Sequence, residues 1–406
     1  MDLRRVLESC FRTSLAAVDP RAVVAEAMRR RVLPERGQVV ILALGKAAAG
    51  MAWGVADAVD RPLTGVVVSD QQVAVPDGLH LVVGGHPLPT QASLDGGAEL
   101  LNAAAGTSPD DLVVCLGSGG GSALAEALVP EVRLDDLRTT TDLLLRSGAS
   151  IDEVNAVRTK VSRLKGGGLA AAVAPATSIT LLVSDVVGDR LDVIASGPMV
   201  APMAAASAAA EVLVRYDLVD RVAPAVLAAT RASPRPPVAA GDVEIVASRR
   251  LAAEAAAAAV RDHRLSAAVL DTELVGEAAP TARRVVAAAH AAQVRVYAGE
   301  TTVTVHGDGR GGRNHEAALA AALELEGSQD RAFLGAGTDG IDGFTPGAGA
   351  VVDGATVNEA RSRGLDPAGY LERNDSGGFF DRVPGRIVTG PTGTNVGDLW
   401  LVARLG

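Results

Sequence analysis

Four short stretches of this sequence combine residue types that suit the binding of phosphate groups and a metal ion. Lysine and arginine provide cations, glycine-rich loops expose main-chain donors, and aspartates provide oxygen ligands. The stretches contain Lys46; Gly117 to Ser122; Asp185 and Asp189; and Arg310, Arg313 and Asn314. Phosphoryl transfer depends on positioned reactants and neutralised charge more than on covalent chemistry, and these residue types can serve both needs.

The glycine-rich segment carries the strongest of these signals. The apolar, β-branched run of residues 112–116 predicts a buried strand, and residues 123–128 favour a helix. Between them stand Gly117, Ser118, Gly119, Gly120, Gly121 and Ser122. Glycines let main-chain N–H groups approach an anion, and the first turn of a helix favours negative charge. The segment predicts a phosphate-binding loop. A strand-to-helix turn without a ligand would look the same, because neither the Walker nor the dinucleotide pattern is present.

Lysine is rare in this chain, which makes each lysine a candidate for a specific role. Lysines and arginines number 38 together, and only Lys46, Lys160 and Lys165 are lysines. Lys46 and Lys165 each stand beside a glycine, and Lys46 follows a predicted strand at residues 38–44. A compact ammonium group placed at the start of a helix is suited to a phosphate, although chance placement would give the same pattern.

Acidic turns follow two other predicted strands. Asp185 and Asp189 come after the apolar run of residues 178–183, and Asp339 and Asp342 lie in a similar turn. Paired carboxylates beside phosphate loops suit Mg²⁺, and one of them could equally act as a base toward a hydroxyl group. The alternative is a structural turn that caps the following helix.

A second glycine-rich loop, residues 307–312, contains Arg310 and is followed by Arg313 and Asn314. The planar guanidinium group suits carboxylate and phosphate oxygens, so this loop predicts a second anion site. A solvated basic turn is the simpler alternative.

Histidine and serine give weaker signals. His86 follows two glycines and is a candidate ligand-binding residue, with a structural loop histidine as the alternative. The histidines, cysteines and acids do not have zinc-ligand spacing. Ser118 does not match the nucleophile motif of hydrolases, because Leu116 occupies the first glycine position.

Predicted strands and helices alternate from residue 38 to about 230, which indicates an α/β fold with a mostly parallel sheet. Ligands of such sheets bind beyond the carboxyl ends of the strands, where Lys46, His86, the glycine loop and Asp185 would meet. The proline-rich residues 231–241 predict a linker and, with it, two domains, 1–237 and 238–406. Further strands are expected at 243–247, 267–270, 295–297 and 302–306, followed by a helix at 315–325.

Composition limits the classes of function. The net charge of −10 and an aromatic content of 2% argue against nucleic-acid binding. Two cysteines cannot form a disulfide framework, and no apolar run reaches the length of a signal peptide or a membrane span. The sequence therefore favours a cytoplasmic protein with small-molecule partners and leaves open whether it is a monomer or a homodimer.

Several motifs, taken in order, resemble the class II glycerate 2-kinases. They are Leu44 to Ala47, Gly84 to Pro89, Gly117 to Leu124, Asn155 to Arg158, Lys165 to Gly167, Ser184 to Asp189 and Ser196 to Pro198. In the second half, Gly299 to Val303, Gly309 to Asn314, Gly337 to Gly340 and Thr389 to Asn395 resemble the family's C-terminal MOFRL domain. The family often has glutamine where this chain has His315.

The resemblance implies a Rossmann-like first domain, a second α/β domain and an active site in the cleft between them. It implies transfer of the γ-phosphoryl group of ATP to the 2-hydroxyl of D-glycerate, with Mg²⁺, to give 2-phosphoglycerate and ADP. It adds Lys165, Glu300 and Asp339 to the expected binding residues, which already include Arg310. Two alternatives remain: an NAD(P)H-dependent hydroxypyruvate reductase, a name often given to members of this family, and a non-catalytic sugar-phosphate-binding regulator.

Overall fold

The computed structural model describes residues 1–201, 208–233, 241–289 and 293–405, which form two compact units. The first unit is Pro20–Val246, and the second joins Met1–Asp19 to Ala247–Gly406. This division differs from the expected ranges 1–237 and 238–406 at both ends of the first unit. Helix α1 (Leu3–Ala17) belongs to the second unit because its apolar stripe, including Leu7 and Phe11, completes a core there.

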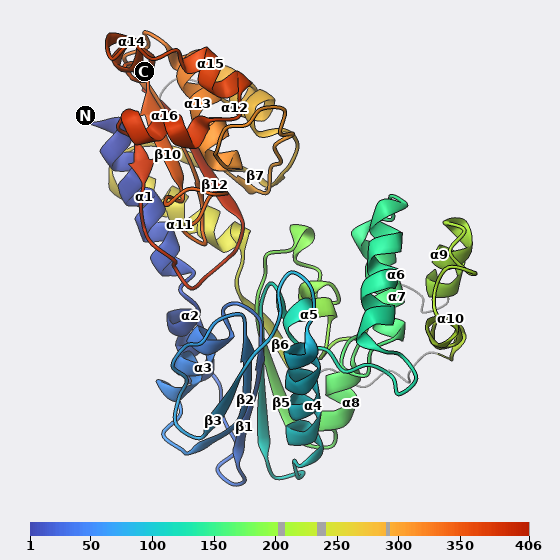
Figure 1. Cartoon of the computed structure of the whole chain (residues 1–406). Helices are drawn as coiled ribbons and strands as arrows, with labels where there is room; N and C mark the ends of the chain where they lie inside the picture. The colour runs from blue at the N-terminus through green and yellow to red at the C-terminus, as the bar shows by residue number, and fades with distance from the viewer. Residues whose placement is uncertain (202–207, 234–240, 290–292, 406) are drawn as a thin grey trace. The chain divides into compact units, whose positions relative to one another are not determined.

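The first unit is built on a six-stranded sheet of Rossmann type (Figure 1). The strand order is β3-β2-β1-β4-β5-β6, and the β1–β2, β2–β3, β1–β4 and β4–β5 pairs are parallel. The strands are β1 Val39–Leu44, β2 Leu63–Ser69, β3 Leu79–Val83, β4 Leu112–Gly117, β5 Thr177–Val183 and β6 Asp242–Ala247. The chain reverses its direction across the sheet between β1 and β4, which is where ligands of this fold class bind. The sequence assigned β6 to the second domain, but it forms the edge of the first sheet.

Helices cover this sheet and confirm most of the expected pattern. They are α2 Pro20–Arg29, α3 Ala48–Ala56, α4 Gln91–Ala105, α5 Gly121–Leu124, α6 Leu134–Arg146, α7 Ile151–Lys160, α8 Gly168–Val173, α9 Ala208–Arg215 and α10 Pro224–Arg231, with 3₁₀ turns η1 Val187–Asp189 and η2 Ile194–Ser196. Pro20 begins α2, where proline's fixed φ suits a first turn, and Ser150 caps α7 by accepting from the N–H of Glu153. Within the expected linker, residues 234–240 lie outside the described part of the chain.

The second unit contains a mixed sheet of order β11-β10-β9-β12-β8-β7, in which only the β7–β8 pair is parallel among the pairings described. Its strands are β7 Ala267–Leu274, β8 Gln293–Gly299, β9 Arg331–Gly337, β10 Gly349–Asp353, β11 Arg386–Ile387 and β12 Asp398–Arg404. Its remaining helices are α11 Arg249–Asp262, α12 Ala278–Ala287, α13 Arg313–Leu325, α14 Thr356–Ser362, α15 Pro367–Glu372 and α16 Ser376–Arg382.

Alternation along β12 explains how this sheet is covered on both faces. Trp400 and Val402 pack with α12 and α13, whereas Leu399 and Leu401 pack with α1 and α11. Successive side chains of a strand point to opposite faces, so one apolar strand serves two cores.

Two sequence expectations are wrong in detail. Residues 302–306 do not form a strand. Thr302 makes one isolated bridge to Glu277, and the Glu277 carboxylate accepts hydrogen bonds from the N–H and hydroxyl of Thr304, 3.0 and 2.8 Å long. These side-chain bonds take the place of a strand ladder. The helix expected at 123–128 is the four-residue α5, because Ala125 turns to extended backbone.

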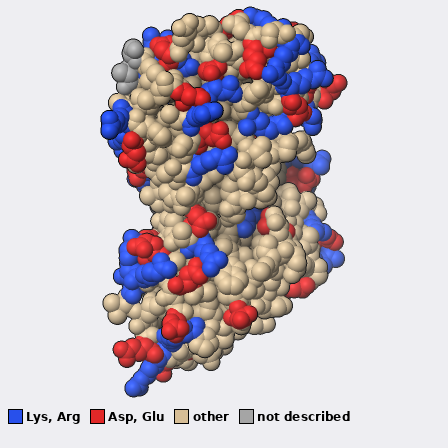
Figure 2. Space-filling model, turned by 90° about the vertical axis from the view of Figure 1, so that its left-hand side faces the viewer, with Lys and Arg blue, Asp and Glu red and all other residues tan. Residues whose placement is uncertain are grey.

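In the part of the chain that the structure describes, no helix has both the length and the apolar character to cross a membrane. Acidic and basic side chains are interspersed over the face shown in Figure 2.

Candidate functional site

The loops that follow β1 and β4 are joined by main-chain hydrogen bonds. The N–H of Lys46 donates to the carbonyl of Gly119 over 3.0 Å, and the N–H of Ser118 donates to the carbonyl of Leu44 over 3.1 Å. The N–H of Ala47 donates to the hydroxyl of Ser118 over 3.0 Å. The structure therefore brings Lys46 and the glycine loop together at the switch point of the sheet, as the strand pattern predicted.

His86 and Asp185 lie against the same loop. A β-carbon placed on Gly120 would lie 3.2 Å from His86 Cδ2 and 3.2 Å from Lys46 Cγ, and one placed on Gly119 would lie 2.1 Å from Asp185 Oδ2. Burial and, secondly, the charge of Lys46 lower the pKa of His86, while Asp70 opposes them. His86 is therefore mainly neutral at neutral pH, next to an exposed ammonium group.

The glycine loop itself is more structural than the sequence indicated. Ser118 is 2% exposed, and its hydroxyl is occupied by the N–H of Ala47, so its side chain is not placed to bind a phosphate. Gly117, Gly119 and Gly121 are buried, and only Gly120 and Ser122 are partly exposed. The expected attraction of an anion to the first turn of a helix is also weak here, since α5 has only four residues. Any contact with an anion is then made at Gly120 and Ser122.

Asp185 precedes the 3₁₀ turn η1 and Asp189 is its last residue, and both are partly exposed. Asp189 adopts a left-handed conformation, with φ of 51°. Its Oδ1 is buried and has no hydrogen-bond partner within the described residues. The same ranges contain no group of three or more His, Cys, Asp or Glu side chains that could hold a metal ion by themselves. Two carboxylates, one with an unsatisfied oxygen, fit Mg²⁺, which usually takes one or two carboxylates and completes its shell with phosphate oxygens and water.

Lys165 differs from its expected role as a ligand-binding residue. Its side chain is fully buried and forms an ion pair with Glu126 in the interior of the first unit. The Glu126 carboxylate also accepts from the hydroxyl of Ser162 over 2.6 Å and from the N–H of Ala127 over 3.0 Å. Burial lowers the pKa of Lys165 to about 8, although Glu126 acts against this shift. This ion pair is part of the interior next to the glycine loop, and the Lys165 ammonium group is not open to a ligand.

In the second unit, Arg313 lies in the first turn of α13, where it binds two acids. Its Nε and Nη2 donate to the two oxygens of Asp398 over 2.6 and 3.0 Å, and its Nη1 donates to Glu300 over 3.0 Å. Burial opposes the charge of Arg313, but Asp398 and Glu300 outweigh it and raise the pKa of the guanidinium group. Its side chain is 33% exposed, so part of this cation is open to solvent.

Asn314 supports Arg313 from the interior. It is 1% exposed, its Nδ2 donates to Asp398 over 2.9 Å, and its Oδ1 accepts from Trp400 Nε1 over 2.9 Å. Asp342 accepts from the N–H groups of Asn314 and His315 and lies 2.5 Å from His315 Nδ1. Asn314 and Arg313 both bind Asp398, and the amide of Asn314 thus helps to orient that carboxylate. Asn314 was expected to contact a ligand, but its side chain is enclosed.

Of the remaining candidates of the second unit, Glu300 and Asp339 lie near Arg313 and Asn314, whereas Arg310 has a separate partner. A β-carbon placed on Gly337 would lie 3.0 Å from Asp339 Oδ1 and 3.6 Å from Asn314 Nδ2. Arg310 is exposed and forms an ion pair with Asp381, so it does not share partners with Arg313 as their common loop suggested. Glu300 is exposed and bound to Arg313, and Asp339 accepts from the N–H of Ile341 over 3.1 Å within its own turn.

Sequence reasoning missed the acids that bind these cations. Glu126 lies in the segment 123–128, for which only a helix was expected, and Asp398 was not a candidate. No local pattern identifies them, because each partner lies far along the chain: 39 residues separate Lys165 from Glu126 and 85 separate Arg313 from Asp398.

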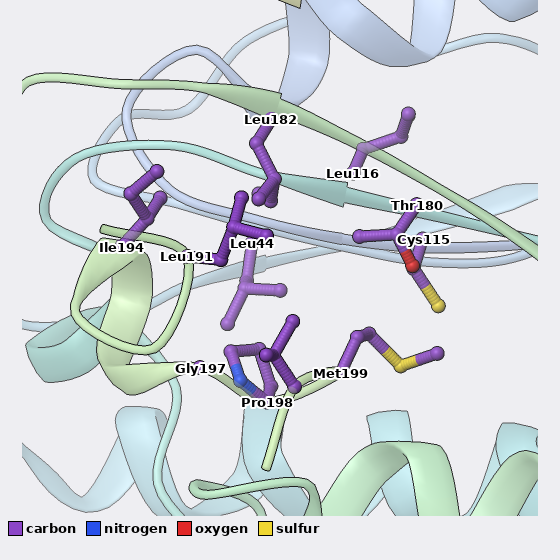
Figure 3. Close-up of a pocket in the computed structure, with 12 residues that line it drawn as sticks. Leu44, Cys115, Leu116, Thr180, Leu182, Leu191, Ile194, Gly197, Pro198 and Met199 are labelled. Carbon is purple, nitrogen blue, oxygen red and sulfur yellow. The ribbon is translucent and has the colours of Figure 1, made fainter. Parts of the chain in front are cut away.

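A small apolar cavity lies beside the glycine loop, between the sheet and residues 191–200. Leu44, Leu182 and Pro198 point into it (Figure 3). Its volume of about 10 Å³ admits one water molecule at most, so it is part of the core and not a substrate site.

Comparison with known proteins matches two segments of the chain to known families. Residues 6–231 match a domain of unknown function, DUF4147, and residues 293–398 match the MOFRL family. A D-glycerate 2-kinase of Thermotoga maritima is 34% identical over 98% of this chain and 97% of its own length. A protein of Agrobacterium vitis with the provisional name hydroxypyruvate reductase is 38% identical over 98% of this chain and 93% of its own.

A solved structure supports the same relationship. The crystal structure of glycerate kinase from Thermotoga maritima superposes with a TM-score of 0.93 at 33% identity and covers 99% of each chain. The order of the two matched domains, the shared fold and the full-length similarity together show that this chain belongs to the class II glycerate kinase family, with an N-terminal DUF4147 domain and a C-terminal MOFRL domain.

Proposed function

We propose that this protein transfers the γ-phosphoryl group of ATP to the 2-hydroxyl of D-glycerate, giving 2-phosphoglycerate and ADP. The observation that carries the proposal is the meeting of Lys46, His86, Asp185 and the Gly119–Gly120 turn at the switch point between β1 and β4. Relatives named D-glycerate 2-kinase and glycerate kinase support the choice of substrate.

Lys46 is assigned to the transferring phosphoryl group. It is exposed, its main chain is held by Gly119, and its side chain lies over Gly120, so its ammonium group is anchored beside the open part of the loop. A fixed positive charge lowers the barrier because it need not reorganise as charge develops on the phosphoryl oxygens. The Nε2 and Nδ1 atoms of a neutral His86 provide one donor and one acceptor for a bound reactant.

Asp185 and Asp189 would hold Mg²⁺, which would neutralise phosphate oxygens when bound. Either carboxylate can also accept the proton of the attacking 2-hydroxyl, since it lies at the same edge of the sheet as Lys46. Removal of that proton leaves an alkoxide oxygen, which forms the new bond to phosphorus as the bond to the ADP oxygen breaks.

Arg313 is assigned to an anionic group of a reactant, with Asn314 and Asp398 as the residues that orient it. The bidentate pair with Asp398 fixes the plane of the guanidinium group, and the exposed third of its side chain is the surface available to a carboxylate or phosphate. Glu300 is the exposed acid that such an anion would displace from Nη1.

The decisive experiment incubates the purified full chain with D-glycerate and Mg-ATP and separates 2- from 3-phosphoglycerate by ³¹P NMR. We expect stoichiometric ADP and 2-phosphoglycerate. Formation of 3-phosphoglycerate would overturn the position of transfer.

A parallel assay follows NADH and NADPH oxidation with hydroxypyruvate, because relatives from Agrobacterium vitis carry the provisional reductase name. The Rossmann strand order is compatible with a dinucleotide, but the loops after β1 and β4 lack the spaced glycines of the dinucleotide fingerprint. Hydroxypyruvate reduction without ADP formation would replace the kinase proposal with the reductase.

A further inference from the structure

Arg158, on α7, forms no ion pair with a residue in the described part of the first unit, although it lies near Glu126. Its Nη2 donates to the carbonyl of Ser122, at the exposed end of the glycine loop, over 2.8 Å. Its Nε is buried and makes no hydrogen bond to any described residue. Arg158 as a whole residue is partly exposed. A guanidinium group in this position has donors available that a bound anion could use.

Arg158 lies near the buried ion pair of Lys165 and Glu126. Glu126 is already paired with Lys165, and Arg158 adds a second cation to the same region. Burial lowers the pKa of Arg158, with Glu126 acting in the opposite direction, and the charge of Arg158 in turn acts to lower the pKa of Lys165. The buried Arg158 Nε, without a hydrogen-bond partner among the described residues, carries a desolvation cost, which a bound anion would reduce.

Two hydroxyl groups stand beside this cation. The Oγ atoms of Ser122 and Ser196 lie 2.7 Å apart, and Ser122 is the residue whose carbonyl Arg158 binds. Ser196 is held there by unusual backbone: Ala195, Ser196 and Gly197 all have positive φ, of 51°, 62° and 57°. Non-glycine residues in this region are strained, and such strain persists where the surrounding structure requires a particular placement.

We propose that Arg158 and Ser122 form an oxyanion-binding subsite next to the glycine loop, which holds the carboxylate of the acceptor or a phosphate of the nucleotide. The guanidinium group supplies charge and the partly exposed Ser122 hydroxyl supplies an adjustable donor, the combination that planar or tetrahedral oxyanions need. Ser196 is buried, and its hydroxyl orients that of Ser122. Naming these two reactants rests on the proposed kinase function. The subsite itself rests on the geometry of Arg158.

The test compares Arg158→Met, which keeps the aliphatic stem without the charge, with Arg158→Lys, which keeps the charge without the fork. Arg163→Met is the matched control, since Arg163 is an exposed arginine five residues along the chain. KM for D-glycerate, KM for ATP and kcat are measured separately on each full-length variant. Thermal shifts are recorded without ligand and with D-glycerate, ADP or inorganic phosphate.

We expect Arg158→Met to raise KM for one reactant by about tenfold to a hundredfold, the factor for losing charge-assisted hydrogen bonds, with a smaller rise in Arg158→Lys and none in the control. The reactant whose KM rises identifies the oxyanion. The melting temperature of ligand-free Arg158→Met should equal or exceed that of the wild type, because a desolvated guanidinium nitrogen without a hydrogen-bond partner in the described part of the chain has been removed.

Unchanged KM values, or a lower ligand-free melting temperature with no loss of ligand stabilisation, would overturn the subsite and leave Arg158 a structural residue. If the wild type does not phosphorylate glycerate, the proposed function fails by itself. The subsite is then decided by binding: inorganic phosphate or D-glycerate that stabilises the wild type but not Arg158→Met supports it, and equal shifts overturn it.

Discussion

Replacing Gly119 by alanine should remove activity while leaving the fold intact. The new β-carbon would lie 2.1 Å from Asp185 Oδ2 and 2.8 Å from its Cγ, whereas ordinary contact begins at 3.4 Å. Gly119 is not among the residues with positive φ, so alanine brings no backbone strain. The carboxylate of Asp185 must therefore move by roughly 1 Å or rotate away, and a displacement of that size can cost about a hundredfold in turnover.

The assay for Gly119→Ala measures kcat for D-glycerate phosphorylation together with thermal melting. We expect kcat to fall by about a hundredfold, with a change in unfolding free energy below about 1 kcal/mol, because the clash is with the end of a side chain that can turn. Gly50→Ala is the control: its β-carbon would meet only Pro20 Cβ, at 3.6 Å. Near-normal kcat in Gly119→Ala would refute the placement of Asp185 in the reaction. Equal losses in Asp185→Asn and Gly119→Ala would support it.

Changes at four further residues test other parts of the two units. Both Lys46→Ala and Lys46→Arg should lose at least roughly a hundredfold in turnover with little change in melting temperature, since a wide planar fork cannot replace a compact ammonium group beside Gly120. Near-normal turnover in Lys46→Arg would mean that the essential cation is another residue. Glu126→Gln should lower the free energy of unfolding at pH 7 by about 3 kcal/mol, because it leaves Lys165 buried without its acid; denaturation within about 0.5 kcal/mol of wild type would contradict this. The pKa of Lys165 in the folded protein is about 8, below its ordinary value of 10.5, so the unfolded chain binds more protons between these pH values. The stability of the wild type relative to Lys165→Met should therefore rise with pH across that interval. Asp398→Asn should raise KM for the anionic reactant bound by Arg313 by about tenfold, and an unchanged KM would separate Arg313 from substrate binding.

The order of strands and helices was largely predictable because it depends on local patterns. The apolar run before Gly117 and the proline at the start of α2 each specify their own segment, and the structure confirms them. Where a distant partner decides the conformation, local patterns fail. Thr302 and Thr304 alternate with valines as a strand would, but the Glu277 carboxylate binds them in a loop.

The sequence by itself determined which residues can do chemistry: a rare lysine after a strand, a glycine-rich turn, acids at a strand end and an arginine at a helix start. These follow from residue type and spacing, which need no knowledge of distant contacts. Only the tertiary structure decided which of them are available. Lys165 and Lys46 both stand beside glycine, yet one is buried against Glu126 and the other is exposed over Gly120. The difference lies in burial and pairing between residues far apart in the chain, and a side chain's environment is set by the fold and not by its neighbours in sequence.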